Sequence, residues 1–357
     1  MSARRRVVCG VWPIVAGVLL SGCSGSYEFD AGPTDARADS LGAASEPFDP
    51  VIRREAWTYA GRPGRVFETA GYRIFTTESR ALLQQRIPAF LERALIRYTT
   101  ALGDLPRPEA KLETYILASR REWELLTREL TGPRAETYLK VRAGGFAEQG
   151  RALLFNIGWR NTFSVASHEG WHQYTQRVFR APLPIWLEEG IAAYMEGYRW
   201  DSRSPELPVF LPWANVERFD RLRAMVDAGR VIPLRQLLGN RPQDLLSIYD
   251  NEAALDYYSQ VWALVHFLRE GEGGRHRAGL EQLLQDAASG ALVERLIETG
   301  DRRALMTYRA RRVGPDLFRI YFDDDLENAE REYDAFVRAI VAPGGRDRIV
   351  AGRSPVR

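Results

Sequence analysis

Runs of β-branched and aromatic residues predict three short strands in the first part of the globular chain, at 72–77, 112–117 and 151–157. Between the first two strands, apolar residues recur at helical spacing over 82–102, which is typical of a helix with one buried face. A shorter helix is predicted at 121–130. The apolar stripe of the longer helix consists of Leu83, Ile87, Phe90, Leu91, Leu95 and Tyr98.

Helical patterns dominate the chain after the third strand. Asn161 and Thr162 are suitable caps for a helix that ends near Phe179, before Pro182 and Pro184 interrupt the pattern. A small lobe with a mixed sheet followed by a mainly helical lobe is an α+β fold, and we expect a cleft between the two lobes. The later helices are predicted at 185–197, 253–270, 280–288 and 326–341.

The N-terminus follows a different pattern. Residues 1–6 are basic, with three consecutive arginines, and 7–20 form an apolar run. A basic start, a short apolar core and small residues before a cleavage site are typical of a secretory signal peptide. The apolar run is shorter than the roughly 20 residues that a transmembrane helix needs. The sequence therefore predicts an exported protein.

The end of this segment, Leu20-Ser21-Gly22-Cys23, resembles the lipobox of bacterial lipoproteins. The resemblance implies that Cys23 is acylated and becomes the new N-terminus, so that a lipid anchors the protein to a membrane. The alternative is an ordinary signal peptide with a cysteine at this position by chance. Ser24 follows instead of Asp, so the resemblance implies no inner-membrane retention and favours the outer membrane, with the domain facing the periplasm or the cell surface.

Composition limits the classes of partner. The chain has 357 residues, of which 45% are hydrophobic, and this is sufficient for a globular core. A net charge of +2 argues against a nucleic-acid partner, which usually requires a strong basic excess. The second cysteine, Cys9, lies in the segment that would be removed, so the mature chain has no disulfide. The sequence does not indicate an oligomeric state.

Shifts in composition divide the chain into five segments. A stretch rich in Ser, Gly, Ala, Asp and Pro follows the signal peptide and is typical of a flexible tether. The predicted segments are a signal peptide at 1–22, a tether at 23–60, an α/β lobe at 65–200, a helical lobe at 201–345 and a disordered tail at 346–357.

One motif carries candidate chemistry. His168-Glu169-Gly170-Trp171-His172 has the spacing of an HExxH metal-binding helix. Residues four apart lie on one face of a helix, so both imidazoles can bind the same metal ion. The glutamate can then reach a water molecule in an open coordination position. The alternative is a histidine pair that packs or faces solvent, but the chain has only four His and apolar residues surround the motif.

A catalytic zinc site usually has three protein ligands, so a third ligand is expected downstream. Together with the HExxH motif, residues 183–192, which read LPIWLEEGIA, resemble the gluzincin superfamily of zinc peptidases, most closely the bacterial DUF1570 or peptidase MA-like proteins. The resemblance implies a zincin-like catalytic domain that binds one Zn²⁺ ion through His168, His172 and the Glu before Gly, which is Glu189. Glu188 is the alternative ligand, and it is otherwise read as a solvated charge.

A second segment, 256–268, resembles the gluzincin helix that carries a tyrosine near the substrate carbonyl. The apolar pattern after the tyrosine implies Tyr258 rather than Tyr257, and a phenol there can donate a hydrogen bond to the oxyanion. The alternative is an aromatic residue of the core. We expect His266 to pack or to lie on the surface, and His276 to be solvated.

The resemblance implies a zinc metallopeptidase that cleaves peptide or protein substrates. In this reading, Glu169 is the general base for the attacking water and then protonates the leaving amine. Two other classes remain open: a zinc hydrolase that acts on cell-wall amides, and a metal-binding surface lipoprotein without turnover.

Overall fold

The computed structural model describes residues 49–141, 144–202, 204, 207–245 and 252–357. The signal segment, Cys23 and most of the expected tether lie outside these residues. Within the described part of the chain, no helix combines the length and the apolar character that crossing a membrane requires.

A six-stranded mixed sheet forms the N-terminal part of the fold, in the order β1-β2-β3-β4-β6-β5. The first three strands form an antiparallel meander, β4 and β6 run parallel to β3, and β5 returns antiparallel along β6 at the edge. The parallel neighbours are joined through helices, as parallel pairs require. The strands are β1 (Arg53–Tyr59), β2 (Arg62–Glu68), β3 (Tyr72–Thr76), β4 (Leu112–Leu117), β5 (Gly145–Glu148) and β6 (Arg151–Phe155).

Both faces of this sheet are covered, because alternate residues of each strand point to opposite sides. Ile74, Ile116 and Leu154 join the large core that also contains residues of α1 (Ala81–Thr100) and α4 (Trp159–Val178). Their neighbours on the other face pack with α2 (Arg120–Thr131) in a smaller core. The members of that core include Tyr115, Leu117, Trp123, Phe146, Leu153 and Phe155. The helix α4 thus lies directly against the sheet.

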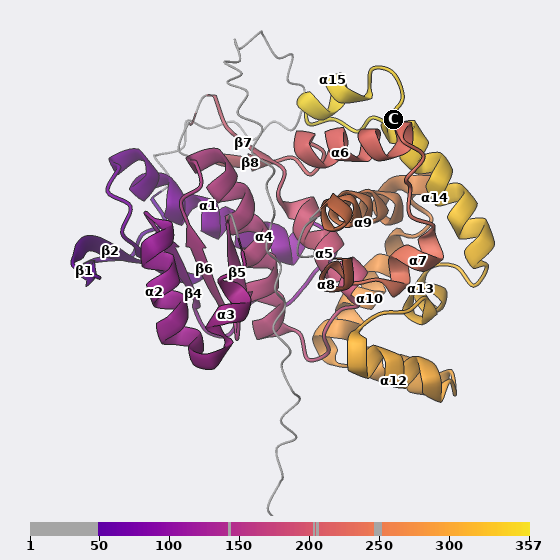
Figure 1. Cartoon of the computed structure of the whole chain (residues 1–357), viewed down its shortest axis with the longest axis horizontal. Helices are drawn as coiled ribbons and strands as arrows, with labels where there is room; N and C mark the ends of the chain where they lie inside the picture. Colours follow the sequence, from indigo (N-terminus) through magenta and orange to yellow (C-terminus); the bar gives the residue numbers. More distant parts are fainter. Residues whose placement is uncertain (1–48, 142–143, 203, 205–206, 246–251) are drawn as a thin grey trace, which may run out of the picture.

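Helices form the second part of the molecule, and Figure 1 shows α4 and α5 between the sheet and this helical part. A short hairpin of β7 (Tyr198–Trp200) and β8 (Pro208–Phe210) follows α5. The expected α+β layout is confirmed. The helices are α3 (Ala135–Tyr138), α5 (Ile185–Met195), α6 (Val216–Asp227), α7 (Leu234–Gly239), α8 (Pro242–Leu245), α9 (Glu252–Glu270), α10 (Arg277–Ser289), α11 (Leu292–Glu298), α12 (Arg302–Arg311), α13 (Asp316–Tyr321), α14 (Leu326–Ile340) and α15 (Gly345–Val350).

Both ends of the described chain are more ordered than the sequence suggested. The tether was expected to reach residue 60, but β1 already begins at Arg53 and pairs along its whole length with β2. The tail at 346–357 was expected to be disordered, which is wrong. It begins within α15, whose Ile349 is fully buried, and it ends with Arg357 Nε 2.9 Å from Glu270 Oε2. A single buried residue in a polar segment gives no periodic pattern, so the sequence did not reveal this packing.

Two local expectations also need correction. The helix α4 begins at Trp159 after Gly158, whose φ of 94° suits glycine, so Asn161 and Thr162 lie inside the first turn. Thr162 still contributes to this end, because its Oγ1 accepts a hydrogen bond from the backbone N–H of Ile157. His276 was expected to be solvated but is only 2% exposed, and its ring packs near Phe267.

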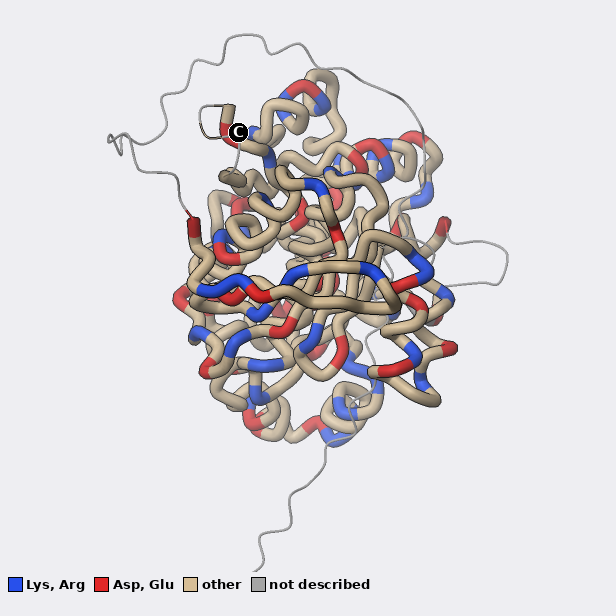
Figure 2. The backbone as a smooth tube through the Cα atoms, turned by 90° about the vertical axis from the view of Figure 1, so that its left-hand side faces the viewer, with Lys and Arg blue, Asp and Glu red and all other residues tan. Residues whose placement is uncertain are grey.

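Charges of both signs lie over the outside of the sheet. On the side of the molecule that carries β1 and β2, Lys and Arg alternate with Asp and Glu (Figure 2). This side of the described chain therefore has no extended area of a single sign, which agrees with the small net charge of the sequence.

Candidate metal centre

The helix α4 presents His168 and His172 one turn apart and holds them firmly. The Tyr98 hydroxyl on α1 donates a hydrogen bond of 2.8 Å to the Ser167 carbonyl. The Ser167 hydroxyl donates in turn to the Met195 carbonyl at the end of α5, over 2.7 Å. Both contacts are made by Ser167, directly before His168, and they fix α4 against α1 and α5 at this point.

The helix α5 brings Glu189 to the histidines, and Gly190 explains how closely this helix can be packed. A Cβ atom at Gly190 would lie 2.7 Å from the Val261 carbonyl oxygen and 2.8 Å from Val265 Cγ2, both on α9. Only glycine lets α5 and α9 approach this closely. The Glu-Gly pair of the sequence thus combines a metal-ligand candidate with a close helix crossing.

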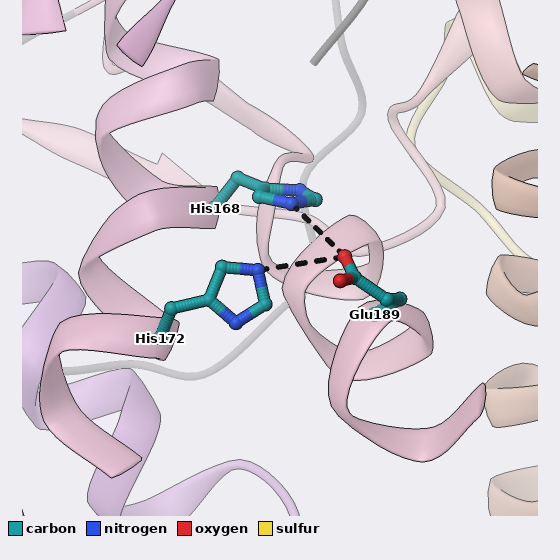
Figure 3. A group of neighbouring side chains, drawn as sticks. All are labelled: His168, His172 and Glu189. Atoms are coloured by element: carbon teal, nitrogen blue, oxygen red, sulfur yellow. Dashed lines mark ion pairs between the residues drawn. The ribbon is translucent and has the colours of Figure 1, made fainter. Parts of the chain in front are cut away.

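His168, His172 and Glu189 form a compact and fully buried group (Figure 3). Glu189 Oε2 lies 3.6 Å from His168 Nε2 and 3.5 Å from His172 Nε2. The two Nε2 atoms and both carboxylate oxygens of Glu189 have no hydrogen-bond partner among the described residues. Buried polar atoms without a partner are costly, so their convergence indicates a place for a cation. The group could bind a metal ion.

The other ring nitrogen of His168 contacts a carboxylate that is itself bound to an arginine. His168 Nδ1 lies 2.8 Å from Glu196 Oε1. Arg218 Nη2 donates to the same oxygen over 2.8 Å, and its Nε donates to Glu196 Oε2 over 3.1 Å. The side-chain amide of Asn215 also donates to Oε2, over 2.7 Å. Because Glu196 accepts these hydrogen bonds, the proton of a neutral His168 lies on Nδ1 and the Nε2 lone pair is free for a metal.

His172 has an equivalent partner. Its Nδ1 lies 2.9 Å from Glu188 Oε1, and the Thr175 hydroxyl donates to that oxygen over 2.8 Å. Arg312 Nη2, from the end of α12, is 3.6 Å from Glu188 Oε2. Glu188 is only 1% exposed, so the reading of this residue as a solvated helix charge is wrong. Its carboxylate instead fixes the orientation of the His172 ring.

The charges within the group shift one another's pKa values. Burial acts to lower the pKa of both histidines, but their glutamate partners outweigh it and raise the pKa of each. Burial acts to raise the pKa of Glu189, but the two histidines hold it at about 2. The pKa of Glu196 is also about 2, because Arg218 and His168 outweigh the effect of burial. Both carboxylates are therefore ionised at neutral pH.

Glu169 lies beside this group and has no ion-pair partner among the described residues. It is fully buried, and neither carboxylate oxygen has a hydrogen-bond partner among the described residues. Burial raises its pKa to about 8, although the neighbouring His168 and His172 act to lower it. A carboxyl group with a pKa near neutrality can both accept and release a proton at physiological pH.

Tyr258 reaches the group from α9. Its ring centroid lies 6.2 Å from that of His168, and the side chain is 2% exposed. The hydroxyl of the alternative residue, Tyr257, donates instead to the Asn240 carbonyl over 3.2 Å. Burial and the charge of Glu189 raise the pKa of both tyrosines well above the usual value. Tyr258 therefore keeps its proton and is the better placed of the two as a hydrogen-bond donor.

Sequence reasoning located the centre but not its support. The structure brings together His168, His172 and Glu189, with Glu169 and Tyr258 adjacent. Glu196 and Arg218 were missed, because they are far from the motif along the chain and no sequence pattern links them to it. The expected cleft does not expose the group, since the two histidines, Glu169 and Glu189 are each 0% exposed.

Comparison with known proteins relates part of the chain to a family. Residues 162–289 match the family model described as "Protein of unknown function (DUF1570)". The matched segment is less than half of the 357 residues. The match confirms the expected relation to DUF1570 proteins for the segment from α4 to α10, which contains the whole metal-ligand group. No curated protein matches the chain. The description of the family names no activity.

Proposed function

We propose that this protein is a zinc-dependent peptidase in which His168, His172 and Glu189 bind the metal. Two imidazoles and one carboxylate form a ligand set of catalytic zinc sites, which leave a coordination position open. Ligand atoms of a tetrahedral zinc with bonds of about 2.0–2.1 Å lie about 3.3 Å apart. The separations of 3.5 Å and 3.6 Å from Glu189 to the two histidines are close to this value.

The observation that carries the proposal is the unpartnered carboxyl group of Glu169 beside this group. Structural zinc sites usually have four protein ligands and are closed. Here the described residues supply three, and the next acidic side chain is buried without a hydrogen bond. A buried carboxyl group of this kind destabilises the fold, so its presence here points to a function. Its position next to the metal ligands suits a group that activates water.

In the proposed reaction, the zinc ion, Glu169 and Tyr258 each have a separate role. A zinc ion held there would supply a Lewis acid that lowers the pKa of a coordinated water from about 15.7 to about 7. Glu169 accepts the proton as the water oxygen attacks the peptide carbonyl carbon. It then donates that proton to the nitrogen of the leaving amine as the C–N bond breaks. Tyr258 donates a hydrogen bond to the developing oxyanion.

The pKa of Glu169 is compatible with this role. It is about 8 in a site without a metal charge. A nearby divalent cation favours the ionised form, so metal binding lowers this pKa and favours the carboxylate that accepts a proton.

A substitution at Glu169 tests the proposal. Glu169→Gln keeps the shape of the side chain but cannot accept a proton. We expect unchanged metal content and a kcat lower by about 10²–10⁴-fold, measured on a peptide library by mass spectrometry. The matched control is Glu270→Gln, which changes another buried carboxylate, on α9, that contacts His266 and Trp213. Full hydrolysis by the Glu169→Gln protein would refute the mechanism.

The complete burial of the ligands favours a second candidate, a metal-binding protein without turnover. His168, His172 and Glu189 are all 0% exposed, so a substrate reaches them only after a movement that opens the site. A wild-type protein that is loaded with zinc but cleaves nothing in the peptide library would support this second candidate over the peptidase.

A further inference from the structure

We infer that Arg218 is a positioning residue for both His168 and Tyr258, and so joins the metal site to the oxyanion donor. The inference rests on the proposed function, because it assigns a role to Arg218 within the same site. It goes further in stating that metal affinity depends on a side chain that does not touch the metal ligands.

The first connection runs through Glu196. The guanidinium of Arg218 donates to both carboxylate oxygens, over 2.8 Å and 3.1 Å. A carboxylate held at both oxygens in this way cannot rotate, and its Oε1 lies 2.8 Å from His168 Nδ1. The orientation of the His168 ring, and hence the direction of its Nε2 lone pair, is therefore determined by Arg218 through Glu196.

The second connection runs to the tyrosine. The guanidinium carbon of Arg218 lies 5.3 Å from the centroid of the Tyr258 ring, which is within the range of a cation–π contact. The same tyrosine ring lies 6.2 Å from the His168 ring. Arg218, Glu196, His168 and Tyr258 thus form a closed ring of contacts. A change at Arg218 reaches His168 through Glu196 and reaches Tyr258 directly.

The position of Arg218 is not explained by anchoring α6 alone. Arg218 is 2% exposed and Glu196 is 7% exposed, so both charges are removed from water at a cost that their attraction only partly offsets. One turn further along α6, Arg221 already ties the helix to Asp256 and Glu252 on α9. An apolar residue at 218 would serve as well for packing, so the buried ion pair points to a role in the site.

Three variants separate positioning from simple stability. Arg218→Lys keeps the charge but loses the planar pair of N–H groups that binds both oxygens of Glu196 in parallel. Arg218→Met leaves the Glu196 charge buried without its arginine partner. The double variant Arg218→Met with Glu196→Gln removes both charges, so it restores much of the stability that Arg218→Met loses. Arg221→Met is the matched control, because it removes an arginine pair from the same helix without changing the contacts of Glu196.

The experiment measures cobalt(II) affinity from the visible absorption spectrum, together with the melting temperature of each protein. We expect the three Arg218 variants to bind cobalt about 10–100-fold more weakly than wild type, with altered absorption bands. In the double variant, the melting temperature recovers but the affinity does not. Arg221→Met melts at a lower temperature and binds cobalt as wild type does.

The outcomes distinguish this inference from the proposed function. Wild-type affinity and an unchanged spectrum in Arg218→Lys and in the double variant would overturn the inference while leaving the peptidase proposal intact. Weakened binding in these variants of a protein that cleaves no peptide would support the inference and contradict the peptidase. A wild-type protein that binds no cobalt or zinc would overturn both.

Discussion

At the scale of single residues, the adjacent glutamates 188 and 189 show how a helix assigns different roles to identical side chains. Successive residues on a helix point about 100° apart. Glu189 therefore faces both Nε2 atoms, while Glu188 reaches the Nδ1 atom of His172 from the outside. Both are buried, and only their direction separates the candidate metal ligand from the residue that orients a histidine.

Alanine substitutions at these two positions should therefore have unequal effects. Glu189→Ala removes a ligand, so we expect loss of stoichiometric zinc. Glu188→Ala leaves three ligands in place and should weaken zinc binding by about 10–100-fold without abolishing it. Competition with a chelator of known affinity measures both. If Glu188→Ala loses the metal and Glu189→Ala keeps it, the assignment of the ligand is reversed.

The sequence was sufficient to find the candidate ligand group and insufficient to find the residues that hold it. His168 and His172 are related by a helical spacing that can be read directly, and Glu189 followed from a local resemblance. Glu196 contacts His168, and Arg218 contacts Glu196, only because the chain after α5 returns through β7 and α6 to the end of α5. The hydrophobic pattern of the sequence does not show which distant segments come into contact. A buried arginine also cannot be distinguished in the sequence from the many surface arginines of this chain.

At the scale of elements, the centre depends on how closely α5 crosses α9. Gly190 follows Glu189 directly. Because it has no Cβ, the Val261 carbonyl and the Val265 side chain can lie where a larger residue would clash with them. The crossing also brings Tyr258, which is less than one turn before Val261 on α9, toward the histidines. A change at Gly190 therefore displaces the helix that carries Glu189 and the helix that carries Tyr258 together.

Gly190→Ala should destabilise the protein by about 1–3 kcal/mol, because the added methyl group meets a backbone carbonyl that cannot move aside easily. We also expect weaker zinc binding, since α5 carries Glu189. Chemical denaturation and metal titration measure these two effects. The matched control is Gly239→Ala, because a Cβ atom at Gly239, the last residue of α7, would meet nothing within 4 Å. A neutral result at Gly190 would contradict the close crossing.

The elements themselves were predicted well where a strand is almost fully buried or a helix has one clearly buried face. The strand at 112–117 and the helix at 326–341 correspond to β4 and α14 almost residue for residue. The hairpin of β1 and β2 was missed because its outer strand alternates only between exposed and half-buried residues. Such a strand gives little hydrophobic contrast, and its pairing with β2 decides its conformation.

At the scale of the whole molecule, the metal group lies between two differently built halves. The sheet and α1 support α4 from one side, and the helices around α9 support α5 from the other (Figure 1). The family match covers α4 to α10, while the sheet before it and α11 to α15 after it lie outside the match. These outer parts still reach the centre, because Tyr98 and Arg312 contact residues next to the ligands.

We also propose that the mature protein is anchored to a membrane through Cys23. Cys23→Ser should abolish lipidation, so the protein should no longer fractionate with membranes and should lose the mass of the acyl chains. Cys9→Ser is the matched control, because Cys9 lies in the segment that signal cleavage removes. Cell fractionation and mass spectrometry of the mature N-terminus measure both variants. Unchanged membrane association of the Cys23→Ser protein would contradict the anchor.

The central claim is that three side chains from α4 and α5 hold one metal ion. The most direct measurement is the zinc content of the purified mature protein, wild type against His172→Ala, after incubation with zinc and dialysis. The account predicts one bound zinc per wild-type chain and almost none in a folded His172→Ala chain. A wild-type protein without stoichiometric metal, or a His172→Ala protein that retains as much zinc as wild type, would contradict it.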